Sequence, residues 1–165
     1  MMKKSIFLFL CFLLAINGYS QRVLLNDQNS ERIAKACHLI KMNAPDIYES
    51  VVIHSTIQRY GHPSNIFHST YNVDGNDLWI LIGQGSLTER SINRLAGTIF
   101  HESLHLLLSL QRRRSGNSWA FSDLSENERK QEEIFVYKRT REFLVRLNTL
   151  DWEIKEYDRW ASAYH

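Results

Sequence analysis

The pattern of apolar and polar positions predicts a chain that is mostly helical, with a small sheet in its first half. Residues 29–45 carry apolar side chains at helical spacing, with Ile33, Cys37 and Ile40 on one face. This segment predicts an amphipathic helix that ends before Pro45, because proline cannot continue a helix from within.

Two further segments predict β-strands. Residues 49–58 are rich in β-branched side chains and indicate a strand, with a helix running from Pro45 as the alternative. Residues 65–83 hold two apolar runs on either side of Asp74 and Gly75, a dipeptide typical of a hairpin turn. The second run, residues 77–83, is either an ordinary buried strand or a sheet edge that an extended peptide could join.

The second half of the chain predicts three helices. Ser86 and Glu89 fit a capping box and predict a long helix over about residues 87–111. Ser125 and Glu128 fit another capping box and open the second helix. Its apolar sector comprises Val136, Tyr137, Thr140, Phe143, Leu144 and Leu147. The last helix is expected to pack through Trp152, Ile154, Tyr157 and Trp160.

Residues 1–20 have the features of a secretory signal peptide. Two lysines precede the apolar run of residues 5–16, and small residues follow, so cleavage is expected after Ser20. A retained N-terminal anchor is the alternative, but the run is short for a membrane span. We therefore expect an exported protein without stable membrane insertion. Residues 21–165 predict a single α+β domain, with a small, mostly antiparallel sheet packed on helices.

Charge and cysteine content bear on nucleic-acid binding and on disulfide formation by the mature domain. The chain has 20 basic and 18 acidic residues, and the excess of two is supplied by Lys3 and Lys4 of the signal. A neutral domain gives no charge-based reason to expect nucleic-acid binding. Cys37 is the only cysteine left after signal cleavage, so no intrachain disulfide can form, and its apolar spacing predicts a buried thiol.

The segment TIFHESLHLLLSLQ places two histidines and a glutamate in an apolar helix. His101 and His105 are four residues apart, so they lie on one helix face about 6 Å from each other and can share one metal ion. Zinc accepts imidazole nitrogens readily, and a catalytic zinc site takes three protein ligands. Glu102 would lie beside the ion, where a carboxylate can accept a proton from water.

A third ligand is needed, and a glutamate of the next helix is the best candidate. The extended motif HExxHxxGxxH is absent, because Leu108 and Gln111 stand at its glycine and third histidine. Glu133 falls near the centre of the apolar sector, Glu132 falls at its edge, and Glu128 points to the charged side. A buried carboxylate needs a metal or a cation, so the alternative is a buried ion pair with a nearby arginine such as Arg129. Asp123 and Glu126 are the remaining acidic candidates.

The sequence HESLH, followed on the next helix by EIFVY, resembles the gluzincin branch of the zincin metallopeptidases, whose second motif is typically ExxxD or ExxAY. The resemblance covers about residues 77–147 and rests on few positions. It implies a zincin-like core, with Glu133 as the third Zn²⁺ ligand and Tyr137 close to the ligands. Val136 stands where that branch has alanine, which is a departure from the motif.

These residues predict an exported zinc peptidase that acts on peptides or proteins, with Glu102 as general base. Tyr137 is expected to donate a hydrogen bond to a ligand histidine or accept one from it. Candidates to stabilise the oxyanion are His54, His62, His68 and Tyr71. The alternatives are a non-catalytic binding protein on a zincin scaffold and a helical structural domain without metal.

Overall fold

The computed structural model describes residues 28–60, 69–116 and 120–164. Within these ranges the chain forms six α-helices and one three-stranded sheet, so the fold is α+β as expected. The predicted signal peptide, His62 and His68 lie outside the described residues. In the part of the chain that is described, no helix is both long and apolar enough to cross a membrane.

The helices and strands follow one another in a simple order. The first half comprises α2 (Gln28–Asn43), α3 (Pro45–Ser50), η1 (Val52–His54), β1 (Ser55–Arg59), β2 (Thr70–Asp74) and β3 (Asp77–Ile82). The second half comprises α4 (Gln84–Thr88), α5 (Ile92–Arg114), η2 (Phe121–Asp123), α6 (Glu126–Arg146), α7 (Asp151–Ala161) and η3 (Ser162–Tyr164).

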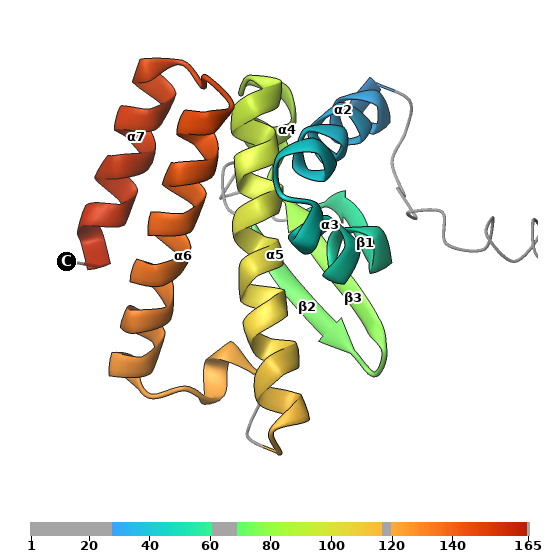
Figure 1. The fold of residues 1–165 in the computed structure, drawn as a ribbon, viewed down its shortest axis with the longest axis vertical. Helices are drawn as coiled ribbons and strands as arrows, with labels where there is room; N and C mark the ends of the chain where they lie inside the picture. The colour runs from blue at the N-terminus through green and yellow to red at the C-terminus, as the bar shows by residue number, and fades with distance from the viewer. Residues whose placement is uncertain (1–27, 61–68, 117–119, 165) are drawn as a thin grey trace, which may run out of the picture.

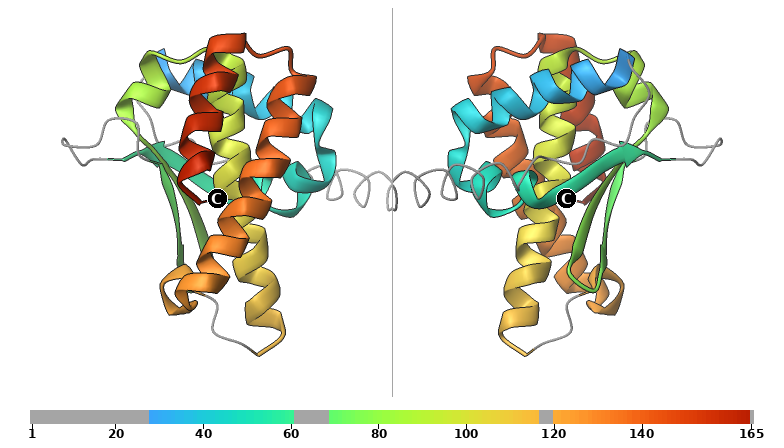
Figure 2. Two further views of the ribbon diagram at one scale, coloured as in Figure 1. Left: turned by 90° about the vertical axis from the view of Figure 1, so that its left-hand side faces the viewer. Right: turned by 90° about the vertical axis from the view of Figure 1, so that its right-hand side faces the viewer.

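Helix α5 is the central element of the fold. Figure 1 shows α6 and α7 on one side of it, and α2, α3 and the sheet on the other. Contacts agree with this arrangement, because α5 packs against α2, α6, β2 and β3. The two views in Figure 2 show the strands along one flank of the helical layer.

The sheet has the strand order β1-β3-β2 and is mixed. β2 and β3 form the expected antiparallel hairpin, with Gly75 in its turn at a φ of 58°, a conformation that glycine adopts without strain. β1 pairs with β3 in parallel, so the prediction of a mostly antiparallel sheet is wrong for this ladder. β3 is therefore the central strand and cannot offer an edge to a peptide, which leaves β1 and β2 as edges of the described sheet.

The first part of the strand predicted over residues 49–58 is not a strand. The alternative, a helix from Pro45, is confirmed: α3 and η1 come first, and only from Ser55 onward does the chain extend into β1. Pro45 occupies the first turn of α3, where its fixed φ suits a helix and no backbone donor is missing. The β-branched side chains of Val51 and Val52 are fully buried, so they contribute to the core rather than to a strand.

The long helix predicted from residue 87 is interrupted. α4 ends at Thr88, and α5 begins at Ile92 behind a new cap, Ser91, whose hydroxyl accepts a hydrogen bond from the Arg94 backbone at 3.1 Å. Ser86 is buried and caps no long helix. The capping box of Ser125 at the start of α6 is confirmed.

Helix α7 packs through a different face from the predicted one. Tyr157 is buried as expected, but Trp152 and Trp160 are exposed large side chains. The buried charged residue is Glu153, which is 0% exposed and accepts hydrogen bonds from the Ser91 backbone at 2.9 Å and from the Ser91 hydroxyl at 2.6 Å. The last helix is thus attached to the N-terminus of α5.

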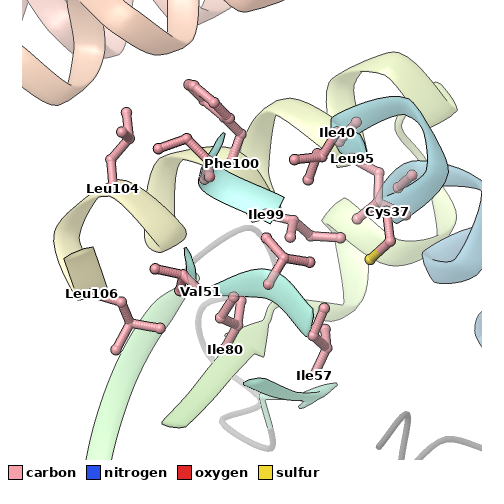
Figure 3. Packing of buried hydrophobic residues seen from close by; sticks show 14 of the residues in the cluster. Cys37, Ile40, Val51, Ile57, Ile80, Leu95, Ile99, Phe100, Leu104 and Leu106 are labelled. Carbon is pink, nitrogen blue, oxygen red and sulfur yellow. The ribbon is translucent and has the colours of Figure 1, made fainter. Parts of the chain in front are cut away.

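The hydrophobic core fills the space between α2, the sheet and α5. Figure 3 shows Ile57 and Ile80 of the sheet near Ile99 of α5, with Cys37 of α2 at one end of the cluster. Cys37 is buried, as predicted. On the other side of α5, the ring of Phe100 stacks on Phe143 of α6 at 4.4 Å between centroids. These contacts hold α5 and α6 at a fixed separation.

Candidate metal site

His101, His105 and Glu133 come together between α5 and α6. The Nε2 atoms of His101 and His105 lie 3.8 and 3.6 Å from the same carboxylate oxygen, Glu133 Oε2. One ligand atom from each of the three residues lies within 4.8 Å of the other two. These are the three residues that the helical spacing and the position of Glu133 in the apolar sector predicted.

The distances from the two Nε2 atoms to Glu133 Oε2 suit the ligands of a shared ion better than direct hydrogen bonds. An N–H···O hydrogen bond spans about 2.7–3.2 Å, so 3.6 and 3.8 Å are too long for one. Ligands bound to zinc at about 2.0–2.2 Å in a tetrahedron lie roughly 3.4 Å from one another. The donor set of two imidazoles and one carboxylate is also one that zinc accepts. The three residues therefore fit a zinc ion.

Each imidazole has a polar partner at its other nitrogen. His101 Nδ1 lies 2.9 Å from the Tyr157 hydroxyl, and His105 Nδ1 lies 2.7 Å from Glu132 Oε1. When Nδ1 holds the proton and donates it to these oxygens, the lone pair of each ring is on Nε2, on the side of Glu133. Both contacts fix the orientation of the rings. The carboxylate of Glu132 accepts the Nδ1 proton of His105, which leaves Nε2 of that ring as the metal-binding nitrogen, whereas the Tyr157 hydroxyl can serve His101 as donor or acceptor.

Glu132 has a role that the sequence did not suggest. Its carboxylate accepts from His105 through one oxygen and pairs with Arg112 of α5 through the other. Arg112 also donates to the Ser109 hydroxyl at 3.0 Å, and Ser109 is 2.9 Å from the Tyr71 hydroxyl of β2. The buried ion pair on α6 is therefore made by Glu132 and Arg112, rather than by Glu133 and Arg129.

The electrostatic environments of the two histidines are opposite. Burial, reinforced by His105 and Arg94, holds the pKa of His101 well below its usual range. Burial also acts to lower the pKa of His105, but hydrogen bonding to Glu132 and the carboxylates of Glu133 and Glu102 outweigh it and raise that pKa to about 9. The site therefore carries excess negative potential around His105, which favours a cation.

Glu102 lies next to the ligands and is 7% exposed. Burial raises its pKa to about 7, an effect that His105 partly offsets and Glu133 reinforces. No hydrogen bond ties its carboxylate to another described side chain, whereas Glu132 is held from two sides. A carboxylate with a pKa near neutrality and free oxygens is suited to exchange protons with a small molecule.

These residues line a cleft of about 370 Å³. Its walls come from the start of β2, from α5, η2, α6 and α7, and from η3 at the C-terminal end of the described chain. Aromatic side chains make up much of the lining, namely Tyr71, Phe121, Tyr137, Tyr157, Trp160 and Tyr164. The cleft is large enough for a few residues of a peptide or for a small ligand.

The tyrosine that contacts a ligand histidine by hydrogen bonding is Tyr157, not Tyr137 as predicted. Tyr137 instead places its ring edge-on to His101 at 4.9 Å between centroids. Tyr157 comes from α7 and is 56 positions away from His101, so helical spacing could not connect the two residues. The sequence had placed Tyr157 only among the packing residues of the last helix.

Of the two predicted oxyanion candidates that the structure describes, His54 and Tyr71, only Tyr71 lines the cleft. It stacks on His105 with 5.8 Å between ring centroids, and its hydroxyl is engaged by Ser109. His54 lies on η1, is exposed and does not contribute to the cleft. Several cleft residues were not predicted as part of the site. Among them are Arg94 and Thr98, which lie on α5 before His101.

Comparisons of the chain with protein-family models, curated proteins and solved structures gave no match. The assignment of a function therefore depends on the geometry of the cleft and on the chemistry of its side chains.

Proposed function

We propose that this protein is an exported zinc-dependent peptidase with a zincin-like core, in which His101, His105 and Glu133 hold the ion. One observation carries the proposal. Both imidazoles have Nδ1 engaged by a polar partner, and both have Nε2 within 3.8 Å of one Glu133 oxygen. The partners at Nδ1 orient both rings, and what points to a metal is that both Nε2 atoms then face one carboxylate oxygen at distances too long for hydrogen bonds.

Bound zinc supplies a Lewis acid that lowers the pKa of a water molecule toward about 7 and polarises a peptide carbonyl. Glu132 and Tyr157 hold the two rings in position, and Arg112 pairs with the second oxygen of Glu132. Glu133 adds the negative charge that a dication requires.

Glu102 is the proposed general base. Its carboxylate takes a proton from the attacking water and passes it to the nitrogen of the leaving amine, so that one C–N bond is replaced by a C–O bond. The raised pKa of about 7 suits both steps, because the group is then partly ionised at neutral pH and can be protonated transiently. A binding protein that kept metal for stability alone would not need a carboxylate at this position.

The substrate is proposed to lie along β2. This strand is an edge of the described sheet, and its residues Thr70 and Tyr71 line the cleft together with Glu133 of α6. An extended peptide can add to such an edge through backbone hydrogen bonds, with its side chains in neighbouring pockets. The sequence had offered β3 as the edge that a peptide could join, but β3 is the central strand of the sheet.

The test combines metal analysis with hydrolysis of a peptide library. The purified mature protein is expected to contain one zinc per chain and to cleave peptides in a way that a chelator abolishes and added zinc restores. The Glu102→Gln variant, prepared in parallel, shows whether cleavage belongs to this site. A fully zinc-loaded protein without hydrolysis would support a non-catalytic binding protein, and a protein without metal would contradict the proposal.

A further inference from the structure

Arg94 is a buried cation without an anionic partner. The residue is 2% exposed and lines the cleft on α5, two helical turns before His101. Among the described residues no hydrogen bond or ion pair reaches its guanidinium, and its Nε has no acceptor. A buried charge without a partner is destabilising, so its presence requires an explanation.

Two aromatic rings hold the guanidinium in place. Its central carbon lies 4.6 Å from the ring centroid of Tyr157 and 5.1 Å from that of Trp160. Such stacking orients a planar guanidinium and leaves its N–H groups, which lie in its plane, available to an acceptor.

The carboxylates nearest to Arg94 along α7 do not form an ion pair with it. Glu153 accepts both of its hydrogen bonds from Ser91. Glu156 pairs with Arg90 through Oε1 at 2.6 Å, while its buried Oε2 has no hydrogen-bond partner and makes no ion pair with Arg94 among the described residues. Neither acid is among the residues that line the cleft, whereas Arg94 is. The missing anion is therefore expected from a ligand in the cleft.

We propose that Arg94 binds the carboxylate of a ligand in the cleft, and that this carboxylate is the free C-terminus of a short peptide. That the ligand is a peptide rests on the proposed function, whereas the recognition of its carboxylate by Arg94 does not depend on hydrolysis. A guanidinium binds a carboxylate through two parallel hydrogen bonds, which is the strongest pairing available to it. The protein then acts close to the C-terminal end of its substrates.

The geometry of helix α5 limits the distance between the bound carboxylate of the substrate and the bond that is cleaved. Arg94 and His101 are seven residues apart, which is about 10 Å along the helix axis. An extended peptide covers about 3.3–3.6 Å per residue. The carboxylate at Arg94 and the bond cleaved at the metal site are therefore separated by about three residues or fewer, which predicts the release of short C-terminal fragments.

The experiment measures binding by calorimetry to the Glu102→Gln protein, which cannot consume the probe. The probes are N-acetyl-trialanine as the free acid, the same peptide as the C-terminal amide, and N-acetyl-Ala-Ala-Asp-amide. The free acid is expected to bind at least about tenfold more tightly than the trialanine amide, the factor typical of a charged hydrogen-bonded pair. Equal binding of acid and amide, or binding of neither, would overturn the proposal.

The third probe separates the two possible sources of the carboxylate. Tight binding of the free acid with weak binding of the aspartate amide supports the C-terminal group. If the aspartate amide binds as tightly as the free acid, or more tightly, the assignment of the C-terminus is overturned.

Variants of two arginines on the same helix provide the control. In the Glu102→Gln protein, the further change Arg94→Gln is expected to reduce the ratio of free-acid to amide affinity to about one. Arg94→Lys in place of Arg94→Gln is expected to retain part of the ratio, because lysine keeps the charge without the planar fork. Adding Arg114→Gln removes the same charge at the exposed end of α5 and should leave the preference unchanged. Melting temperatures of all variants establish that they are folded.

Chelator treatment separates this inference from the proposed function. A carboxylate can also bind a metal directly, so the titrations are repeated after metal removal. A preference that persists without metal and disappears with Arg94→Gln supports the proposal, even if no peptidase activity is found. A preference that disappears with metal and persists in Arg94→Gln overturns it, while leaving the zinc peptidase proposal intact.

Discussion

Glu132 Oε1 lies 2.7 Å from His105 Nδ1, and the other oxygen of the same carboxylate pairs with Arg112. Sequence spacing placed Glu132 at the edge of the apolar sector and favoured Glu133 as the ligand. The contact with His105 gives Glu132 a separate role, because it orients a proposed zinc ligand. Glu132→Ala should weaken zinc binding by about 10–100-fold, measured by competition with a chelator of known affinity.

The control for this variant is Glu142→Ala on the exposed side of the same helix. Glu142 makes only a solvated ion pair with Arg139 at 3.6 Å, so its loss should leave zinc affinity unchanged. Equal affinities of the two variants would mean that Glu132 does not position His105.

Glu133→Gln should have a larger effect than Glu132→Ala. Glutamine has almost the same volume as glutamate but removes the charge of the proposed third ligand. Zinc content after dialysis should fall from one per chain to a small fraction, because two imidazoles alone bind zinc weakly. Retention of full zinc by this variant would show that the third ligand is another residue.

Glu102→Gln should separate metal binding from chemistry. The residue is adjacent to His101 in the chain and lines the cleft without belonging to the proposed ligand set, so the variant should keep zinc and melt near the wild-type temperature. Hydrolysis should fall by about 10²–10⁴, the usual loss when a general base is removed. Undiminished hydrolysis would place the base elsewhere.

Glu153→Ala should destabilise the protein and loosen α7. The carboxylate is 0% exposed and is the acceptor for both the backbone N–H and the hydroxyl of Ser91. Its loss leaves buried donors unsatisfied, at about 1–3 kcal/mol, and a thermal melt should shift down by several degrees. The matched variant Asp158→Ala removes an exposed ion pair with Arg141 on the same helix and should shift the melt little.

Local sequence patterns predicted the parts of the molecule that depend on local spacing. The i, i+4 histidine pair, the hairpin at Asp74 and Gly75, and the capping box at Ser125 each arise within a few residues, and all are present. The position of Glu133 beside the histidines also followed from the periodicity of its own helix.

Long-range packing determined what the sequence patterns missed. Tyr157 reaches His101 from 56 positions away, and Glu153 reaches Ser91 from 62. The direction of β1 depends on which strand it pairs with, which its composition does not encode. One signal was available, since Glu153 and Tyr157 are four residues apart and share a face of α7, and this face rather than the tryptophans is buried.

The central position of α5 also determines how the ligand histidines can move. A helix enclosed by α2, α6 and two strands cannot unfold locally without disrupting the core, so the backbone amides near His101 and His105 should exchange hydrogen with solvent only in global opening events. Fraying of the ligand helix is therefore no route by which an ion could escape. Dissociation would have to proceed through the cleft, with both imidazoles still in place, and its rate would report the strength of the ligand bonds rather than the flexibility of the chain.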